Sequence, residues 1–173
     1  MKTELVRDAI SAAGFGFAIV VSRWNYGFTS RLEAGARTAL VDAGAEDNRI
    51  EVFKVPGAFE LPLAALKAAE SGRFDAVIAL GVVIRGDTPH FEFVAGQAAA
   101  GLMQASMKSA VPVLFGVITA DTIEQAQARC GEGADNKGYE AAQSAIEMAE
   151  LMRQMEARND ELFRARLESL NVA

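Results

Sequence analysis

The sequence predicts an α/β fold in three layers, a sandwich with a central parallel four-stranded sheet between two layers of helices. Two observations support this prediction. Four short runs rich in Val, Ile and Leu recur along the chain, and helical segments of about the length of a crossover connection lie between them. Three of the four runs are almost continuously apolar, which is typical of strands covered on both faces. Strands that alternate with helices in this way indicate βαβ units and a parallel sheet.

The expected strands cover residues 17–22, 50–55, 75–80 and 111–118. The expected helices cover residues 30–43, 59–71 and 91–109, a segment that begins at residue 121, and residues 138–167. Several boundaries carry local signals. Ser30 and Glu33 form a capping box at the start of the first helix, and Gly44 ends it. Gly72 ends the second helix, and Asp121 is the expected N-cap of the fourth.

The 173 residues have the size of one ordinary domain, and no linker, repeat or low-complexity tract divides them. We therefore expect a single domain over residues 1–173. Residues 1–14 carry no strong strand signal and form an expected mobile N-terminal segment. Residues 157–173 form a charged C-terminal tail, which is either a solvated extension of the last helix or a docked segment. Its charge pattern favours the solvated helix.

The composition excludes several classes of function. Lys and Arg number 17 against 23 Asp and Glu, so the net charge of −6 argues against nucleic acid or an anionic membrane as the main partner. The longest apolar runs are too short to span a bilayer. Cys130 and His90 are the single residues of their types, which excludes a disulfide framework and a Cys/His zinc site within one chain. We expect a cytoplasmic protein without a metal, in which any histidine chemistry involves His90.

The segments that follow the predicted strands concentrate the residues with chemical potential. In an open parallel sheet, ligands bind outside the carboxyl ends of the strands. Trp24 follows the first strand, Glu60 follows the second, and residues 81–90 follow the third. The indole of Trp24 can stack on a heteroaromatic ring or can cap the edge of the core. The carboxylate of Glu60 can accept hydrogen bonds from a polyol or can satisfy a helix N-terminus.

The turn before the third helix is the candidate anion site. Gly86 permits unusual backbone angles, and free N–H groups near a helix start can bind an anion. Thr88 adds a hydroxyl donor, whereas Asp87 opposes an anion unless its side chain points away. His90 stands at the first turn of the helix, where an imidazole with a reference pKa of about 6.5 suits proton transfer. The alternative is a histidine that caps the helix or lies on the surface.

Two cations later in the chain can reach a phosphate. Arg129 lies late in the fourth helix, and Lys137 follows the turn over residues 131–136. The alternative for Arg129 is a partner of the helix C-terminus or a surface ion pair. Nothing in the sequence indicates an activated thiolate at Cys130, which is taken as structural. No GxxxxGK[ST] or GxGxxG motif is present.

Several of these segments together resemble the 6,7-dimethyl-8-ribityllumazine synthase family of riboflavin biosynthesis. The matching runs are VPGAFELP at residues 55–62, ALGVVIRGDTPHFEFV at 79–94, PVLFGVITADTIEQAQARC at 112–130 and NKGYEAAQSAIEMAEL at 136–151. The resemblance extends over about residues 17–155. It implies a flavodoxin-like fold and the condensation of 5-amino-6-(D-ribitylamino)uracil with 3,4-dihydroxy-2-butanone 4-phosphate, with release of phosphate and water. It also implies that no metal or redox cofactor takes part.

The resemblance implies a role for each matched residue. On the pyrimidine side, Trp24 matches the residue that stacks on the ring. The ribityl chain is bound at the positions of Ala58, Phe59 and Glu60. The uracil edge is read by the backbone at the positions of Val82, Val83 and Ile84. Phe115 matches a residue that packs over the pyrimidine from the neighbouring subunit. On the phosphate side, Asp87 and Thr88 match the binding turn and Arg129 matches the pairing arginine. Lys137 is the second cation near this group, and His90 matches the histidine that transfers protons.

The resemblance also implies an assembly. A pentamer is the minimum, because the family's active site spans two adjacent subunits. The turn at residues 131–136 has the length found in members that form sixty-subunit shells, although its letters differ from theirs. A non-catalytic shell protein that binds a flavin or lumazine is the alternative function, and another flavodoxin-like phosphate-binding enzyme is a second alternative. The combination of His90, Glu60, Thr88 and Arg129 favours the condensing enzyme.

Overall fold

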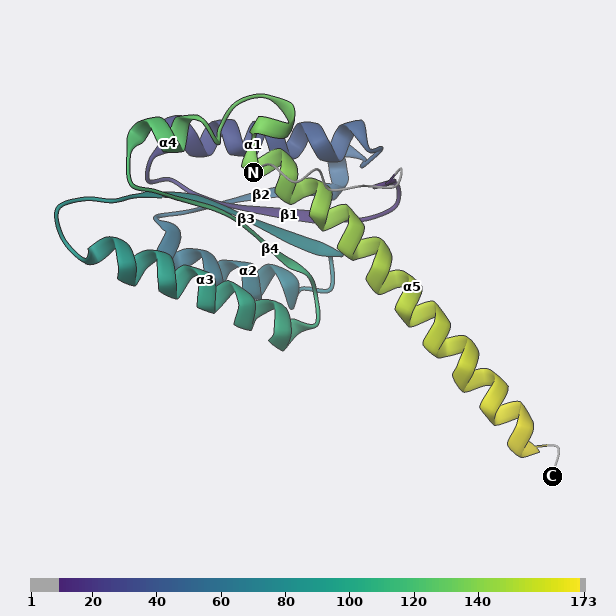
Figure 1. The fold of residues 1–173 in the computed structure, drawn as a ribbon. Coiled ribbons are helices and arrows are strands. Elements are labelled where there is room, and N and C mark those ends of the chain that lie inside the picture. Colours follow the sequence, from purple (N-terminus) through teal and green to yellow (C-terminus); the bar gives the residue numbers. More distant parts are fainter. Residues whose placement is uncertain (1–9, 172–173) are drawn as a thin grey trace.

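The computed structural model describes residues 10–171 and contains one parallel sheet of four strands, as predicted (Figure 1). Its strands are β1 (Phe17–Ser22), β2 (Ile50–Val55), β3 (Ala76–Ile84) and β4 (Val113–Ala120). They lie in the order β2-β1-β3-β4. The chain therefore adds β2 on one side of β1, and then β3 and β4 on the other side. The order reverses beside β1, and this is where open parallel sheets bind their ligands.

Helices cover both faces of the sheet, which confirms the three-layer α/β/α architecture (Figure 1). One layer contains α1 (Tyr26–Asp42), α4 (Ile123–Gln127) and α5 (Lys137–Asn171). The other layer contains α2 (Leu61–Ala69) and α3 (His90–Ser109). Three short 3-10 turns, η1 (Asp47–Arg49), η2 (Ala58–Glu60) and η3 (Gly133–Asp135), lie in the connections. The connections at the carboxyl ends of the strands carry most of the predicted functional residues.

Alternate residues of β1 divide the core into two parts. Phe17, Ile19 and Val21 are buried in the cluster under α1 and α5. Ala18 and Val20 are buried in the cluster under α2 and α3. Side chains on the two faces of a strand alternate, so this central strand anchors both helical layers. Full burial of a side chain such as Ile19 contributes about 1.5–3 kcal/mol.

The first helix begins earlier than the sequence predicts. β1 and β2 have the predicted bounds, but α1 begins at Tyr26 and not at residue 30. Asn25 adopts a left-handed conformation with φ of 60°, which turns the chain from the strand directly into the helix. Glu33 lies within the helix and pairs with Lys54, so the predicted capping box is wrong. α1 ends at Asp42, one residue before the predicted end, and Gly44 follows it with φ of +93°. α2 ends at Ala69, two residues before the predicted end, and Gly72 stands in the turn after it with φ of +70°.

The third strand ends later than the sequence predicts. β3 continues to Ile84, because its last residues pair in register with β4, up to Ile84 against Ala120. The hydroxyl of Thr122 accepts from the N–H of Gln125 at 3.2 Å, so Thr122 and not Asp121 is the N-cap of α4. The longer β3 moves the carboxyl edge of the sheet outward. The turn that follows it is correspondingly shorter, over residues 85–89.

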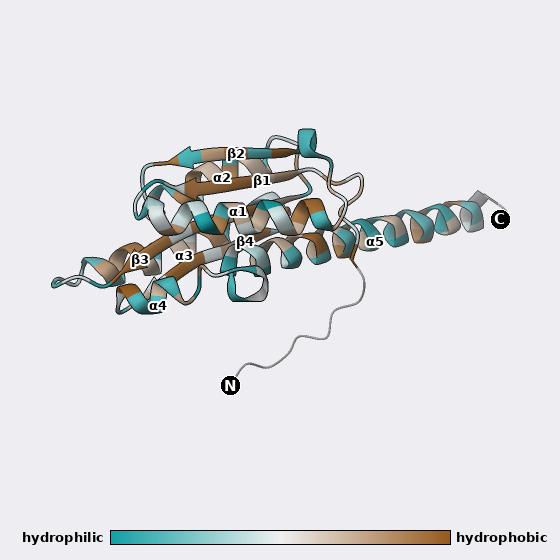
Figure 2. Ribbon diagram, turned by 90° about the horizontal axis from the view of Figure 1, so that it is seen from above, coloured by the Kyte–Doolittle hydropathy of each residue, from teal (hydrophilic) through white to brown (hydrophobic). Residues whose placement is uncertain are grey.

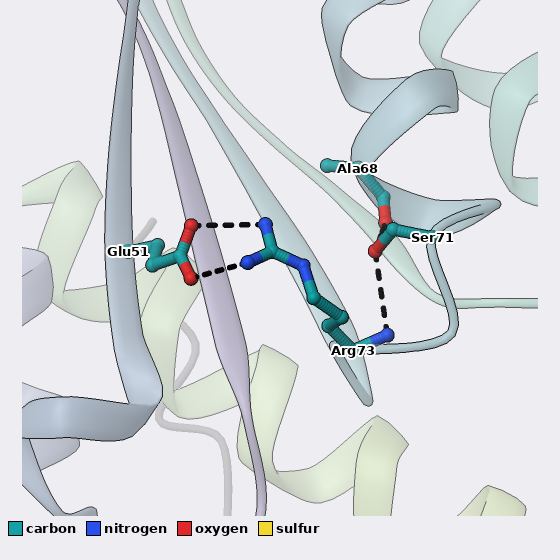
Figure 3. A network of polar contacts seen from close by, with 4 residues as sticks. All are labelled: Glu51, Ala68, Ser71 and Arg73. Atoms are coloured by element: carbon teal, nitrogen blue, oxygen red, sulfur yellow. Dashed lines mark hydrogen bonds and ion pairs between the residues drawn. The ribbon is translucent and has the colours of Figure 1, made fainter.

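A polar network lies at the other end of the sheet, where the strands begin (Figure 3). The guanidinium of Arg73 donates to both carboxylate oxygens of Glu51 at 2.7 and 2.9 Å, and its carbon lies 4.8 Å from the ring centre of Phe74. The backbone N–H of Arg73 donates to the hydroxyl of Ser71 at 3.3 Å. These groups join the start of β2 to the turn before β3. Exposed ion pairs of this kind contribute about 0–1 kcal/mol to stability.

The last helix projects well beyond the sandwich (Figure 1). α5 continues through the charged segment to Asn171, and residues 157–169 are exposed. Figure 2 shows this distal part as mostly hydrophilic, in contrast to the strands. At the other end, residues 1–9 of the expected mobile segment lie outside the described residues, whereas Ala12 is buried and its N–H donates to the Ala43 carbonyl at 2.8 Å. None of the helices within residues 10–171 combines the length and apolar character needed to cross a bilayer.

Candidate active site

The larger hollow, here called the Trp24 hollow, lies at the carboxyl ends of β1, β2 and β3. Its volume is about 610 Å³. It is lined by Trp24, Asn25, Gly57, Ala58, Phe59, Glu60, Val82, Val83, Ile84, His90, Phe93 and Val94. These residues come from the connections after β1 and β2, from the end of β3, and from the first turns of α3. The hollow therefore lies beside the point where the strand order reverses, as expected for a ligand site in this class of fold.

Aromatic rings dominate the mouth of the Trp24 hollow. Trp24 is 73% exposed, so the alternative in which it caps the core is wrong. Phe59 and Phe93 are also exposed, at 58% and 67%. A Cβ atom on Gly57 would lie 3.1 Å from Oε2 of Glu60 and 3.2 Å from the indole Cδ1 of Trp24, so the glycine lets both side chains approach the backbone closely. Exposed flat rings at the rim of a hollow can stack on a flat heteroaromatic ligand.

Glu60 has the capping role that the sequence left open, and it also lines the Trp24 hollow. Its Oε2 accepts from the N–H of Gly57 at 2.8 Å, which fixes the turn at the start of η2. An ionised carboxylate has about four lone-pair sites, so one backbone donor leaves capacity for ligand hydroxyls. The two interpretations are therefore compatible.

Asn25 and Phe93 line the Trp24 hollow, and the list of candidate residues from the sequence does not include them. The Asn25 amide donates to the carbonyl of Val82 at 2.8 Å and so ties the connection after β1 to the end of β3. A signal for Asn25 was available, because asparagine tolerates the left-handed conformation that a sharp strand-to-helix turn requires. Phe93 follows His90 by three residues in α3, and this spacing puts both side chains on one helix face.

The candidate anion turn lies between β3 and α3. His90 is the first residue of α3 and lines the Trp24 hollow, while Asp87 and Thr88 lie in the exposed turn before it. Gly86 does not use its conformational freedom: its φ is not left-handed, and a Cβ there would meet no atom within 4 Å. Gly86 was expected to adopt unusual backbone angles in this turn, and it does not adopt them.

A second, smaller hollow, here called the Arg129 hollow, lies between the edge strand β4 and α5. Its volume is about 270 Å³. It is lined by Leu114, Phe115, Gly116, Val117, Ile118, Thr119, Arg129, Lys137, Glu140, Ala141 and Ser144. The guanidinium of Arg129 donates to the carbonyl of Gln125 at 2.8 Å, in agreement with its predicted alternative as a partner of a helix C-terminus. The ammonium of Lys137 pairs with Glu140. Both cations are exposed.

Asn136 positions the start of α5 and thus Lys137. It is 2% exposed, and its amide donates to the carbonyls of Arg31 and Gly131, each at 2.9 Å. Its Oδ1 accepts from the N–H groups of Gly138 and Tyr139 at 2.8 and 3.1 Å. This side chain therefore caps α5 and connects it to α1.

Most of the predicted site residues thus line one of two separate hollows, whereas Asp87 and Thr88 lie in the exposed turn before α3 and line neither. The Trp24 hollow contains the pyrimidine-side candidates and His90, whereas the Arg129 hollow contains Phe115, Arg129 and Lys137. Neither hollow contains both His90 and Arg129. Cys130 lies beside Arg129 in sequence but is 3% exposed, and burial raises the pKa of its thiol, so it is not an activated nucleophile.

Comparison with known proteins gives a single family. The model of a family described as 6,7-dimethyl-8-ribityllumazine synthase matches residues 14–153, a range that contains both hollows. A protein of that name from Syntrophus aciditrophicus is 56% identical over 144 residues, which are 83% of this chain and 94% of the relative. Proteins of the same name from Desulfatibacillum aliphaticivorans and Chlorobium chlorochromatii are 50% and 47% identical and are covered over 97% and 100% of their lengths. This chain therefore belongs to the 6,7-dimethyl-8-ribityllumazine synthase family.

Proposed function

We propose that this protein is a transferase that condenses 5-amino-6-(D-ribitylamino)uracil with 3,4-dihydroxy-2-butanone 4-phosphate. The product is 6,7-dimethyl-8-ribityllumazine, formed in the penultimate step of riboflavin biosynthesis, and phosphate and water are released. The observation that carries this proposal is the identity of 47–56% to proteins named as this synthase, over almost their whole lengths. The contents of the two hollows agree with it, since one has aromatic rings and the other has cations.

The Trp24 hollow is the proposed site of the pyrimidine. Its volume of about 610 Å³ lies within the usual range of roughly 300–1,000 Å³ for small-molecule sites. Trp24 stacks on the ring, and the backbone at Val82, Val83 and Ile84 reads the uracil edge. The connection at Ala58, Phe59 and Glu60 binds the ribityl chain, with Glu60 accepting from its hydroxyls.

The Arg129 hollow of a neighbouring subunit is the proposed complement. Because Phe115, Arg129 and Lys137 line a hollow separate from that of His90, an assembly of several copies supplies both parts to one site. Phe115 then packs over the pyrimidine, and Arg129 and Lys137 face the phosphate held at Asp87 and Thr88. The proposed unit is a homopentamer in the cytoplasm, and the length of the turn at residues 131–136 favours an icosahedral shell of sixty subunits. Light scattering distinguishes these two assemblies by mass.

The chemistry follows from these positions. An amine attacks the ketone, one water is lost as the imine forms, phosphate leaves, and the second amine attacks the remaining carbonyl and closes the ring with loss of a second water. Each step moves a proton, and His90 is placed to accept and return it. Arg129 stabilises the charge on the departing phosphate. Orientation of the two substrates contributes about 7 kcal/mol or more to the lowering of the barrier. The protein groups need no metal for these roles.

Mixing the protein with both substrates and recording the absorbance of the lumazine tests the proposal. We expect the absorbance to grow in proportion to enzyme concentration, with release of one equivalent of phosphate. Binding of lumazine or a flavin without any growth in absorbance would favour the non-catalytic shell protein instead. The absence of both binding and turnover would favour a different phosphate-binding enzyme of the same fold.

A further inference from the structure

Arg85 follows β3 directly and makes contacts that the proposed mechanism does not use. Its Nε donates to Oδ1 of Asp121 at 2.6 Å, and its Nη1 donates to Oε1 of Glu92 at 2.6 Å. Its guanidinium carbon lies 4.2 Å from the ring centre of Phe91. Its backbone N–H donates to the carbonyl of Ala120 at 2.9 Å and so extends the pairing of β3 with β4 by one residue. The side chain therefore has a defined place between three elements.

The contacts of Arg85 with Phe91 and Glu92 hold the first turn of α3 in place. Phe91 and Glu92 immediately follow His90 in this helix. Residues within one helical turn move together, since the backbone hydrogen bonds fix their relative positions. Holding Phe91 and Glu92 therefore also holds His90. None of the side-chain hydrogen bonds within residues 10–171 involves Asp87, Thr88 or His90, so this turn depends on its neighbours for order.

The hydrogen bond from Arg85 to Asp121 connects it to the segment that orients Arg129. The N–H of Asp121 donates to the side chain of Gln125 at 2.8 Å. The backbone carbonyl of Gln125 in turn accepts from the guanidinium of Arg129 at 2.8 Å. Arg85 thus joins the turn before His90 to the turn before α4. Ile84 and His90, which flank the first turn, line the Trp24 hollow, whereas Thr119 and Arg129, on either side of the second turn, line the Arg129 hollow.

The charge of Arg85 also suits its place. Asp87, Glu92 and Asp121 bring three carboxylates to the turn where a phosphate is proposed to bind. The two ion pairs offset part of this negative charge, and they raise the pKa of the Arg85 guanidinium above its ordinary value. Guanidinium is suited to this place because its planar fork binds two carboxylates and stacks on a ring at once, which an ammonium does not do.

We propose that Arg85 is a positioning residue, which holds the first turn of α3, and with it His90, against the end of β4. This proposal rests on the proposed function for its kinetic consequence. The geometric part, in which Arg85 orders residues 86–92, stands on the contacts alone.

The test compares Arg85→Met with Arg73→Met in the assembled protein. Arg73 is a matched control, because its guanidinium also pairs with a carboxylate (Figure 3). It also lies over a phenylalanine ring, but it stands before β3, at the other end of the sheet from Arg85. We expect Arg85→Met to lower kcat by about 10-fold to 100-fold, the range for a small misplacement of a reacting group. The KM for the pyrimidine is expected to stay the same, and Arg85→Lys is expected to give an intermediate kcat. Hydrogen exchange is expected to become faster at the amides of residues 86–92.

Arg73→Met is expected to change neither kcat nor exchange at residues 86–92. Equal kcat values for the two methionine variants would overturn the proposal, as would faster exchange without any loss of kcat. If Arg85→Met does not assemble, Glu92→Gln and Asp121→Asn remove one contact each, and each is expected to lower kcat by a smaller factor. If the unaltered protein forms no lumazine, the proposed reaction is wrong. The exchange measurement alone then decides whether Arg85 holds this turn.

Discussion

The two hollows of this chain differ in size, in chemistry and in their place on the sheet. The Trp24 hollow has about 610 Å³ and is lined by connections after β1 and β2 and by the end of β3. The Arg129 hollow has about 270 Å³ and lies along the edge strand β4, under α5. The first presents aromatic rings and a carboxylate, whereas the second presents two cations. In the proposed function, the first hollow binds the flat heterocycle and the second, from a neighbouring copy, faces the phosphate ester.

Arg129→Ala is expected to have the largest effect, because it removes the cation that is proposed to face the leaving phosphate. Loss of a fixed donor to developing charge lowers kcat by about 10²-fold to 10³-fold. The KM for the butanone phosphate is expected to rise, while the KM for the pyrimidine stays the same. Steady-state kinetics with each substrate varied in turn measure both values. An unchanged kcat and KM would exclude the Arg129 hollow from the site.

His90→Ala is expected to slow turnover by about 10²-fold without abolishing it. General acid–base catalysis contributes about 10²-fold to 10⁴-fold, and the lower value applies where water can replace an exposed imidazole. Steady-state turnover of the variant with both substrates saturating measures the loss. Full activity of the variant across the pH range would contradict a proton-transfer role.

Mixed assemblies test whether the two hollows belong to different copies. If His90→Ala and Arg129→Ala chains assemble at random, about one quarter of the sites receive an intact part from each chain. We expect co-expressed variants to regain about a quarter of the unaltered activity, a gain of roughly 25-fold over His90→Ala alone. The control is a mixture of His90→Ala with Trp24→Ala, which alters the same hollow in both chains and is expected to regain nothing. No gain in the first mixture would mean that one chain supplies both parts.

The sequence predicted correctly which edge of the sheet gathers Trp24, Glu60 and His90. It predicted less well where the nearby helix α1 begins and where the strand β3 ends. Trp24, Glu60 and His90 were recognised because residues after parallel strands meet at one edge. The start of α1 was missed, because a left-handed Asn25 begins the helix without the expected cap. The length of β3 was also missed, since its last residues depend on pairing with β4, which is remote in sequence. Likewise, residue spacing does not show that α3 and α4 lie on opposite faces of the sheet, so the separation of His90 from Arg129 was not predicted (Figure 1).

Trp24→Phe is expected to have the smallest effect, and it sharpens the comparison by altering only the pyrimidine side. Phenylalanine keeps a stacking ring but loses area, and differences between aromatic contacts of this kind amount to about 0.5–1 kcal/mol, or roughly 2-fold to 5-fold in KM. The KM for the pyrimidine is expected to rise by this factor, while the KM for the butanone phosphate and kcat stay the same. Because Trp24 is the single tryptophan of the chain, its fluorescence in the unaltered protein reports the same contact directly. We expect quenching by the pyrimidine alone and none by inorganic phosphate, since phosphate is proposed to bind between the turn at Asp87 and Thr88 and the cationic hollow of the neighbouring copy. Quenching by phosphate would instead mean that the anion binds beside the indole, and the division of roles between the two hollows would then be wrong.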